Sequence, residues 1–211
     1  MESCFYKSTG RSLIIGSILA ITTMILHPAG GSIEYIIEMS KPFQLTHSIA
    51  ISCLPFIVFG FYGLTYKLLD EWRFSVLAFI VIVFGLNAAM LAALFNGIIL
   101  PDFLNQYSES MEQDIMVLKP IMNYGFAINK ALDYVFIVSL CVGIAIYAFV
   151  IIRLQKAPKR IGYYGIMIFV FAIIGWITNF AFTSLLGFRM IVFSIVGWML
   201  CSGIFLIQSQ N

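Results

Sequence analysis

Asn129, Lys130 and Asp133 have the clearest capacity for chemistry in this chain, because they are strongly polar or ionisable and lie within an apolar stretch. Asp133 follows Asn129 by four positions and Lys130 by three, so in a helix these side chains share one face or neighbouring faces. Ionisable groups inside a membrane are expensive to bury and mark a functional site by default. The alternative is that Lys130 extends to the lipid headgroups and Asp133 only pairs with it. We predict that all three residues contact a small-molecule ligand.

The two histidines of the chain, His27 and His47, indicate a second kind of site. Glu34 and Glu38 lie between them, four positions apart. Two imidazoles and two carboxylates can hold a divalent metal ion, and two imidazoles alone can ligate a haem iron. The spacing matches no metal-binding motif, and the alternative is that His27 ends one helix, His47 begins the next and both glutamates are solvated. A metal or haem site, with Glu34 or Glu38 as ligand or general base, is therefore a hypothesis.

Asn96, Asn179 and Arg189 are the other polar residues that we assign to the candidate ligand site. An asparagine in a membrane helix ordinarily makes an interhelical hydrogen bond worth about 0.6 kcal/mol. These three residues and the two groups above, however, all fall in the same half of the predicted membrane layer. A cavity that opens on that side is the simplest arrangement that satisfies so many polar groups.

Composition places these residues in a membrane protein. Apolar residues make up 61% of the chain and charged residues 10%, and the mean hydropathy is +0.99. A soluble chain of 211 residues cannot bury so much apolar surface. A helix needs about 20 apolar residues to cross the hydrocarbon core. We therefore predict an all-α integral membrane protein, a six-transmembrane-helix bundle that forms one domain over residues 1–211. The six spans are expected near residues 12–26, 47–66, 74–100, 126–152, 163–186 and 188–207.

Basic residues fix the expected orientation of this bundle. Eight of the twelve Lys and Arg residues lie in the N-terminal tail and in the turns after the second and fourth runs. Cytoplasmic loops carry an excess of Lys and Arg, so we expect both termini in the cytoplasm of a cell with a bacterial-type inner or plasma membrane. The polar residues above then lie in the outer half. The alternative is that the first run is a cleaved signal peptide, because Lys7 and Arg11 precede it and Pro28-Ala29-Gly30-Gly31 follows it.

Each of the two long external loops carries the pattern of a short amphipathic helix lying in the membrane interface. In residues 27–46, Ser32 is a candidate N-cap, three isoleucines form one apolar face, and Lys41-Pro42 ends the segment. In residues 101–125, apolar side chains recur at spacings of three and four, and the segment leads through Pro120 into the fourth span. The apolar residues of this second pattern are Leu104, Tyr107, Met111, Ile115 and Leu118.

The sequence lacks the phosphate-loop, dinucleotide-binding, zinc-protease and hydrolase motifs, and nothing in it indicates a nucleic-acid partner. Three hypotheses therefore remain. The first is a protein that binds or transports a small polar or amphipathic molecule in an outward-facing cavity. The second is a membrane-embedded metal or haem protein, either an enzyme or a non-catalytic protein, with His27 and His47 as ligands. The third is a structural or regulatory subunit whose external helices dock a partner.

Overall fold

The computed structural model describes residues 2–28, 30–108, 111–154 and 157–209. Over these ranges the chain is helical and contains no strand. This confirms the predicted all-α class, and six of the described helical segments are long and apolar enough to cross a membrane, as a multi-pass membrane protein requires. In chain order the elements are α1 (Glu2–Leu26), α2 (Ile33–Glu38), α3 (Ser40–Lys67), a 3₁₀ turn (Leu69–Glu71), α4 (Trp72–Leu94), a π turn (Phe95–Ile99), α5 (Leu100–Asn105), α6 (Met111–Leu154), α7 (Lys159–Ile177) and α8 (Leu185–Gln208).

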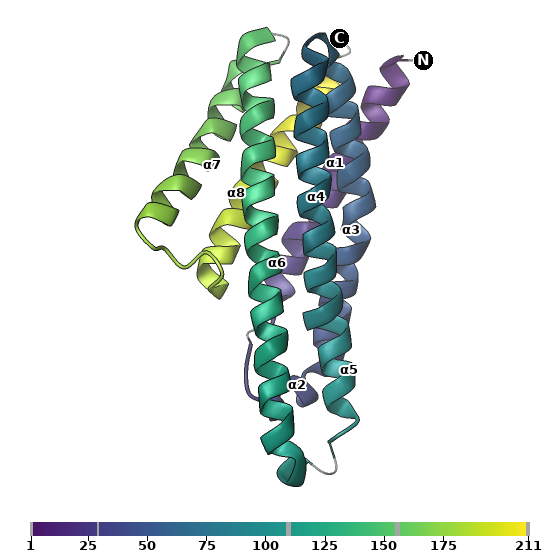
Figure 1. Ribbon diagram of the computed structural model, residues 1–211. Helices are drawn as coiled ribbons and strands as arrows, with labels where there is room; N and C mark the ends of the chain where they lie inside the picture. The colour runs from purple at the N-terminus through teal and green to yellow at the C-terminus, as the bar shows by residue number, and fades with distance from the viewer. Residues whose placement is uncertain (1, 29, 109–110, 155–156, 210–211) are drawn as a thin grey trace.

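Both termini lie at one end of the bundle, together with the turns that join α3 to α4 and α6 to α7 (Figure 1). We call this the proximal end, and the opposite end, which carries α2 and α5, the distal end. Helix α1 packs against α3 and α8, and α4 packs against α3 and α6. Helix α7 packs on α6 and diverges from the bundle toward its distal end. Five helices therefore form a ring, whose weakest contact is between α6 and α8.

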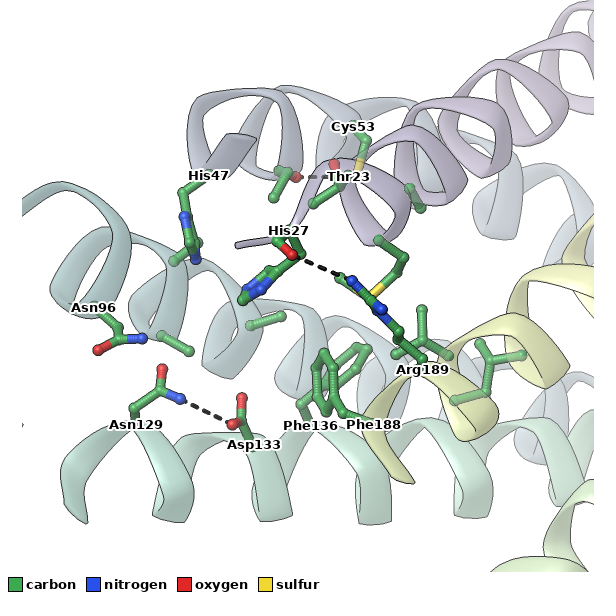
Figure 2. Close-up of a pocket in the computed structure, with 18 of the residues that line it drawn as sticks. Thr23, His27, His47, Cys53, Asn96, Asn129, Asp133, Phe136, Phe188 and Arg189 are labelled. Carbon is green, nitrogen blue, oxygen red and sulfur yellow. Dashed lines mark hydrogen bonds between the residues drawn. The ribbon is translucent and has the colours of Figure 1, made fainter. Parts of the chain in front are cut away.

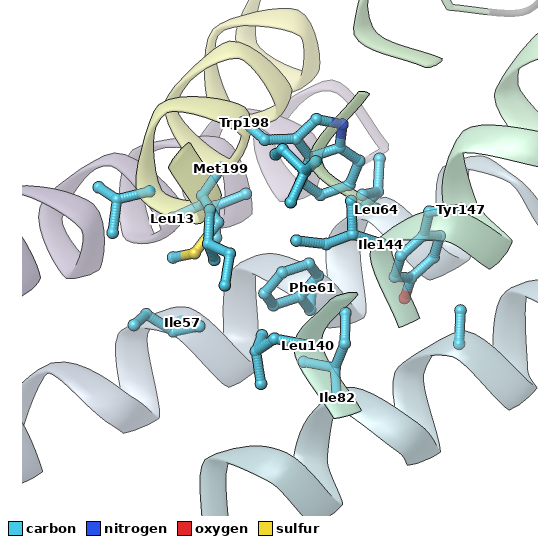
Figure 3. Close-up of a cluster of buried hydrophobic side chains, with 14 of the residues drawn as sticks. Leu13, Ile57, Phe61, Leu64, Ile82, Leu140, Ile144, Tyr147, Trp198 and Met199 are labelled. Atoms are coloured by element: carbon cyan, nitrogen blue, oxygen red, sulfur yellow. The ribbon is translucent and has the colours of Figure 1, made fainter. Parts of the chain in front are cut away.

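The proximal half of the ring is filled by an aromatic stack of Phe61 from α3, Tyr147 from α6 and Trp198 from α8 (Figure 3). All three side chains have no exposed surface. The Phe61 ring centre lies 5.9 Å from that of Tyr147 and 6.3 Å from that of Trp198. The Trp198 Nε1–H donates to the Ile161 carbonyl at 2.9 Å, and the Tyr147 hydroxyl is hydrogen-bonded to Thr65. The stack closes the proximal half with its polar atoms satisfied.

The distal end has a smaller apolar cluster of its own, formed by α2, α5 and the first turns of α6. Ser32 caps α2 as predicted, since its Oγ accepts a hydrogen bond from the Tyr35 N–H at 3.4 Å. At about 1.5 Å per residue, α6 is roughly twice as long as the hydrocarbon core is thick. In a bundle that spans a bilayer, part of α6 therefore extends beyond the hydrocarbon core. The buried residues of this distal cluster are Ile33, Ile36, Leu100, Leu104, Leu118 and Met122.

The first two long helices begin earlier than the apolar runs predict. Helix α1 begins at Glu2 instead of residue 12, because basic residues interrupt the apolar run but favour the helix. Helix α3 begins at Ser40 instead of residue 47. The prediction that Lys41-Pro42 ends the preceding segment is therefore wrong. Pro42 lies in the first turn of α3, where its missing N–H removes no helical hydrogen bond.

The separate helix expected within residues 101–125 does not form. Residues 100–105 make α5, which continues from α4 through the π turn, and Met111 already belongs to α6. Helix α6 runs through Pro120 without a break. Leu118 and Met122 on either side of this proline are both buried in the distal cluster. Packing of these neighbours stabilises a helix that the proline alone would interrupt.

Candidate functional site

A cavity of about 440 Å³ lies in the distal half of the bundle, between α1, α3, α4, α6 and α8 (Figure 2). Seven of the ten residues predicted from the sequence line it: His27, His47, Asn96, Asn129, Lys130, Asp133 and Arg189. The rest of the wall is mostly apolar and reaches toward the aromatic stack through Met24, Cys53, Ile57, Leu140, Ile195 and Met199. A mostly apolar cavity with a few converging polar groups is the usual form of a small-molecule site.

His27 and His47 converge, which the sequence could not establish. Their ring centres are 4.9 Å apart and their planes are inclined by 65°. The His27 Nδ1 lies 2.9 Å from the Pro28 carbonyl oxygen, and the His47 Nδ1 lies 2.8 Å from that of Phe43. Because a carbonyl oxygen can only accept, Nδ1 must carry the hydrogen in both rings. In a neutral ring, Nε2 then presents a lone pair.

The charge state of His27 follows from its surroundings. Burial lowers the pKa of His27 from its ordinary value near 6.5, and the Arg189 guanidinium lowers it further. The hydrogen bond to the Pro28 carbonyl raises the pKa and offsets part of this effect. The neutral imidazole of His27 is therefore favoured at neutral pH, and its Nε2 acts as a hydrogen-bond acceptor.

The π turn at the end of α4 shapes the wall opposite His47. Gly97 lies in this turn, and a Cβ atom at that position would overlap the His47 ring. The preceding residue, Asn96, lines the cavity, and its Oδ1 is buried without a hydrogen-bond partner among the described residues. Single π turns inside α-helices occur frequently at functional sites, because the extra residue redirects neighbouring side chains.

Asp133 pairs with Asn129 and not with Lys130. The Asn129 Nδ2 donates to the Asp133 Oδ2 at 2.9 Å. Lys130 lines the cavity but is exposed, and no salt bridge joins it to Asp133 in the described part of the chain. The pairing of Asp133 with Lys130, the alternative considered from the sequence, is therefore not what this structure shows. The carboxyl group faces the cavity with a neutral amide as its partner.

Arg189 lies on the far side of the cavity from α6, near the start of α8. One of its terminal nitrogens donates to the His27 carbonyl oxygen at 3.2 Å, and its Nε is buried without a partner among the described residues. Phe188, next to it, contacts Phe136 of α6 with a ring-centre distance of 6.0 Å. This aromatic pair bridges α6 and α8 at the edge of the cavity (Figure 2).

Four buried polar atoms lack a partner in the described ranges, and two of them are on the cavity. The other two are the hydroxyls of Ser17 and Ser202, on α1 and α8, which do not line the cavity. Buried polar groups are nearly always hydrogen-bonded, so each exception calls for a cause. A molecule bound in the cavity would explain why the Asn96 Oδ1 and the Arg189 Nε both lack partners, because it would supply a hydrogen bond to each.

Asn179 does not line the cavity, because α7 ends at Ile177 and not near residue 186 as predicted. Asn179 has a positive φ of 55° and is exposed. The Phe180 N–H donates to the Gly175 carbonyl at 2.7 Å, and the Asn179 N–H donates to that of Trp176 at 3.2 Å. This pair of bonds is the Schellman arrangement, in which asparagine tolerates the left-handed backbone. Asn179 therefore has a structural role at the end of α7.

Glu34 and Glu38 are exposed on α2 and do not line the cavity. The described residues contain no group of three or more His, Cys, Asp or Glu that could hold a metal ion. The four-residue metal site proposed from the sequence is thus not assembled. Only its two histidines come together.

Sequence reasoning overlooked the apolar wall. Leu86, Ala89, Ala93 and Asn96 recur along one face of α4 and its π turn, and all four line the cavity. Small residues at helical spacing ordinarily indicate close helix packing. Here the same spacing ends in a polar residue, Asn96. Small residues followed by a polar residue on one helix face are the sequence pattern that could have predicted a cavity.

Comparison with known proteins gave no match to a protein-family model, to a curated protein or to a solved structure. The function must therefore be argued from the geometry of the cavity.

Proposed function

We propose that this multi-pass membrane protein binds a small amphipathic molecule in the distal cavity. The observation that carries the proposal is a pair of buried atoms, Asn96 Oδ1 and Arg189 Nε, that lack partners in the described part of the chain and lie on a cavity with mostly apolar walls. An unsatisfied buried polar group costs about 1–3 kcal/mol, so a chain that retains two of them beside a hollow gains stability when a ligand fills it. The polar side chains that line the cavity bind the head of the ligand, and the apolar wall binds its tail.

The volume of the cavity limits the size of the ligand. At about 30 Å³ for each water-sized group, 440 Å³ holds on the order of 15 non-hydrogen atoms. This corresponds to a head group with a chain of about eight to ten carbons, or to a small ring system with a polar substituent. A complete phospholipid does not fit.

We propose that the protein binds this molecule, and we do not propose transport. The aromatic stack of Phe61, Tyr147 and Trp198 fills the proximal half, so the described residues provide no polar route from the cavity through the bundle. We propose, from the distribution of Lys and Arg along the chain, that the distal end faces outward. The ligand then enters from the outer leaflet or from the outer aqueous phase.

A cavity-filling variant tests the proposal. The full chain in nanodiscs is screened by thermal unfolding against ten-carbon amphiphiles with cationic, anionic, zwitterionic and neutral heads. At least one should raise the midpoint for the wild type and not for Ala89→Phe, whose ring occupies the cavity. Ala131→Phe, on the exposed face of α6, is the matched control and should respond as the wild type does. No shift with any head group, or the same shift in Ala89→Phe, would contradict the proposal.

A metal ion held by His27 and His47 is the second candidate, supported by their anchored Nδ1 atoms. With a metal–nitrogen distance of about 2.1 Å, two imidazoles at a tetrahedral angle have ring centres about 5.2 Å apart, and axial haem ligands about 6.4 Å. The observed 4.9 Å fits the first arrangement and not the second. Elemental analysis of the protein purified without chelators, compared with His47→Gln, tests this candidate. Equal metal content in both proteins contradicts it.

A further inference from the structure

Besides the exposed Lys130, the cavity is lined by an acidic and a basic side chain, Asp133 and Arg189, which do not pair with each other in the described structure. Asp133 of α6 has only the neutral Asn129 amide as its partner, and Arg189 of α8 binds a neutral backbone carbonyl. No ion pair between the two side chains is found in the part of the chain that the structure describes. Both residues line the same cavity. A charge in an apolar environment is costly unless it is paired, so each group favours a counter-charge from outside the chain.

The aromatic bridge explains why the chain does not pair these groups itself. Phe136 lies one helical turn after Asp133, and Phe188 directly precedes Arg189. The two rings contact each other between α6 and α8, and Figure 2 draws them beside the line from the Asp133 carboxyl group to the Arg189 guanidinium. The charges are thereby kept apart at two places on one wall, with the open cavity beside them.

The neutral polar groups add a preference for hydrogen-bond donors near Asp133. The Nδ1 atoms of His27 and His47 are both engaged with carbonyls, so their Nε2 atoms are acceptors in the neutral rings. The Asn96 Oδ1 is a third acceptor, and no described residue is hydrogen-bonded to it. On the other side, the Nε of Arg189 is a donor that has no partner among the described residues. The polar side chains of the cavity therefore present hydrogen-bond acceptors in one place and a cationic donor, the Arg189 guanidinium, in another.

We propose that the ligand is a zwitterionic amphiphile, whose ammonium group lies against Asp133 and the acceptors and whose acidic group binds the Arg189 guanidinium. This inference rests on the proposed function and names the chemical class of its ligand. An ammonium group has three donors, which matches a site rich in acceptors, and a guanidinium is the side chain best suited to bind a carboxylate. The faces of Phe136 and Phe188 offer the cation a further favourable contact. The tail occupies the apolar wall toward Ile57 and Met199.

The test uses four ten-carbon probes that differ only in their heads: 2-aminodecanoate, decylamine, decanoate and decanol. Their binding to the full chain is measured by calorimetry in phosphatidylcholine nanodiscs, after subtraction of partitioning into empty nanodiscs. With the wild type we expect 2-aminodecanoate to bind at least about tenfold more tightly than each of the other three. This comparison needs no variant, so it tests the inference even if a substitution prevents folding.

Two variants then separate the charges. Asp133→Asn should weaken binding of 2-aminodecanoate and decylamine by about tenfold and leave decanoate unchanged, because only the ammonium loses its partner. Arg189→Gln should weaken 2-aminodecanoate and decanoate and leave decylamine unchanged. Lys119→Gln is the matched control, since this lysine is exposed on α6 and does not line the cavity, and all four affinities should stay within about twofold.

The outcomes distinguish this inference from the function on which it rests. If decylamine, decanoate or decanol binds the wild type as tightly as 2-aminodecanoate, and Ala89→Phe abolishes that binding, the cavity binds amphiphiles but the zwitterion assignment is wrong. Equal loss for all four probes in Asp133→Asn also overturns the assignment. If none of the probes binds more to the protein than to empty nanodiscs, the zwitterion assignment fails together with the proposed amphiphile site.

Discussion

The two halves of this bundle have similar apolar exteriors and opposite interiors. In the proximal half, Phe61, Tyr147 and Trp198 stack without exposed surface, and the polar atoms of the tyrosine and tryptophan are hydrogen-bonded. In the distal half, the same helices line a cavity on which Asn96 and Arg189 each keep a buried atom with no partner in the ranges that the structure describes. The proximal half is filled by these large rings, although the Ser202 hydroxyl there is also buried without a partner among the described residues. The distal half keeps polar groups that lower stability, as is typical of binding sites.

The contrast has a simple physical origin in the residues that the helices present. At the proximal level, large rings from three helices fill the interior of the ring. At the distal level, α4 presents alanines where a large side chain would fill the space, and the π turn adds a glycine opposite His47. The alanines thus leave the hollow, and the glycine lets the His47 ring pack closely against the π turn, without a change in the overall arrangement. The predictions below test whether the two halves differ in stability as this comparison requires.

The largest effect is expected in the proximal half, from Phe61→Ala. Removing the central ring of the stack leaves a void bordered by Tyr147 and Trp198, and the free energy of unfolding should fall by about 3–5 kcal/mol. Equilibrium unfolding in bicelles, followed by tryptophan fluorescence, measures the loss. The matched control is Phe84→Ala, because Phe84 is 64% exposed on the outside of α4 and should cost much less. Equal losses in the two variants would contradict the assignment of the stack as the main stabilising core.

A smaller loss is expected at the junction of the π turn and α3. In Gly97→Ala the added methyl group overlaps the His47 ring, and the displacement should cost about 1–3 kcal/mol. The same substitution in a His47→Ala background should cost almost nothing, because the overlapping ring is gone. Gly30→Ala is the control, since a Cβ at that position meets no atom within 4 Å. A cost that is independent of residue 47 would show that the close approach is not the reason for the glycine.

An effect of opposite sign is expected at Asn96. Asn96→Leu removes a buried oxygen that has no partner in the described structure, so the free energy of unfolding of the empty protein should rise by about 1 kcal/mol. Asn129→Leu is the matched control on the same cavity. It should lower stability, because the Asp133 carboxyl group loses its hydrogen bond. The midpoint of thermal unfolding in the absence of added amphiphile distinguishes the two, and destabilisation by Asn96→Leu would count against an unsatisfied distal site.

In the proximal half, the hydrogen bond between Tyr147 and Thr65 contributes less to the free energy of unfolding than the packing of the aromatic stack. The Thr65 hydroxyl donates to the Phe61 carbonyl at 2.8 Å, so the Tyr147 hydroxyl donates to Thr65. Tyr147→Phe should lower the free energy of unfolding by about 0.6 kcal/mol, the usual value for a hydrogen bond between membrane helices. In a Thr65→Val background the same change should have almost no effect. A double-mutant cycle measures this coupling energy. A coupling energy near zero would show that the hydrogen bond does not stabilise the proximal half.

The sequence was sufficient to predict the class of fold but only part of the site. Apolar runs and their lengths identified six membrane-spanning helices, because hydropathy is a property of each segment alone. Helix ends were less predictable: α1 and α3 start earlier than their apolar runs, and packing in the distal cluster carries α6 through Pro120. Seven of the ten predicted site residues share the cavity, since the half of the membrane in which each lies follows from chain direction.

The errors in the site have a common cause, which is that local geometry decides what a polar residue does. Asn179 appeared to belong to a span, but it adopts a positive φ and ends α7. Asp133 has a lysine and an asparagine within reach on its own helix, and the structure pairs it with the asparagine. The π turn that places Gly97 against His47 has no local sequence pattern that we could recognise. Such features depend on neighbouring helices and require coordinates.

The smallest expected effect is a dependence of distal stability on pH. The pKa of His27 is lowered in the folded protein, chiefly by burial and further by Arg189, and is near 6.5 in the unfolded chain. Above pH 6.5 neither state binds the proton, and the full stability is present. As the pH falls through this value, the unfolded chain binds a proton that the folded one does not, so the free energy of unfolding decreases. The decrease ends once the pH is below the lowered pKa of the folded state.

His27→Gln separates this contribution from the other titrating groups. Glutamine keeps a hydrogen-bonding side chain but does not titrate, so the decline in unfolding free energy from about pH 8 to about pH 5 should become shallower in the variant. Phe61→Ala, which weakens the proximal half, should lower the whole curve and leave its slope as in the wild type. Parallel curves for the wild type and His27→Gln would mean that His27 titrates alike in both states. In that case the distal cavity would already be open to water, unlike the dry proximal stack.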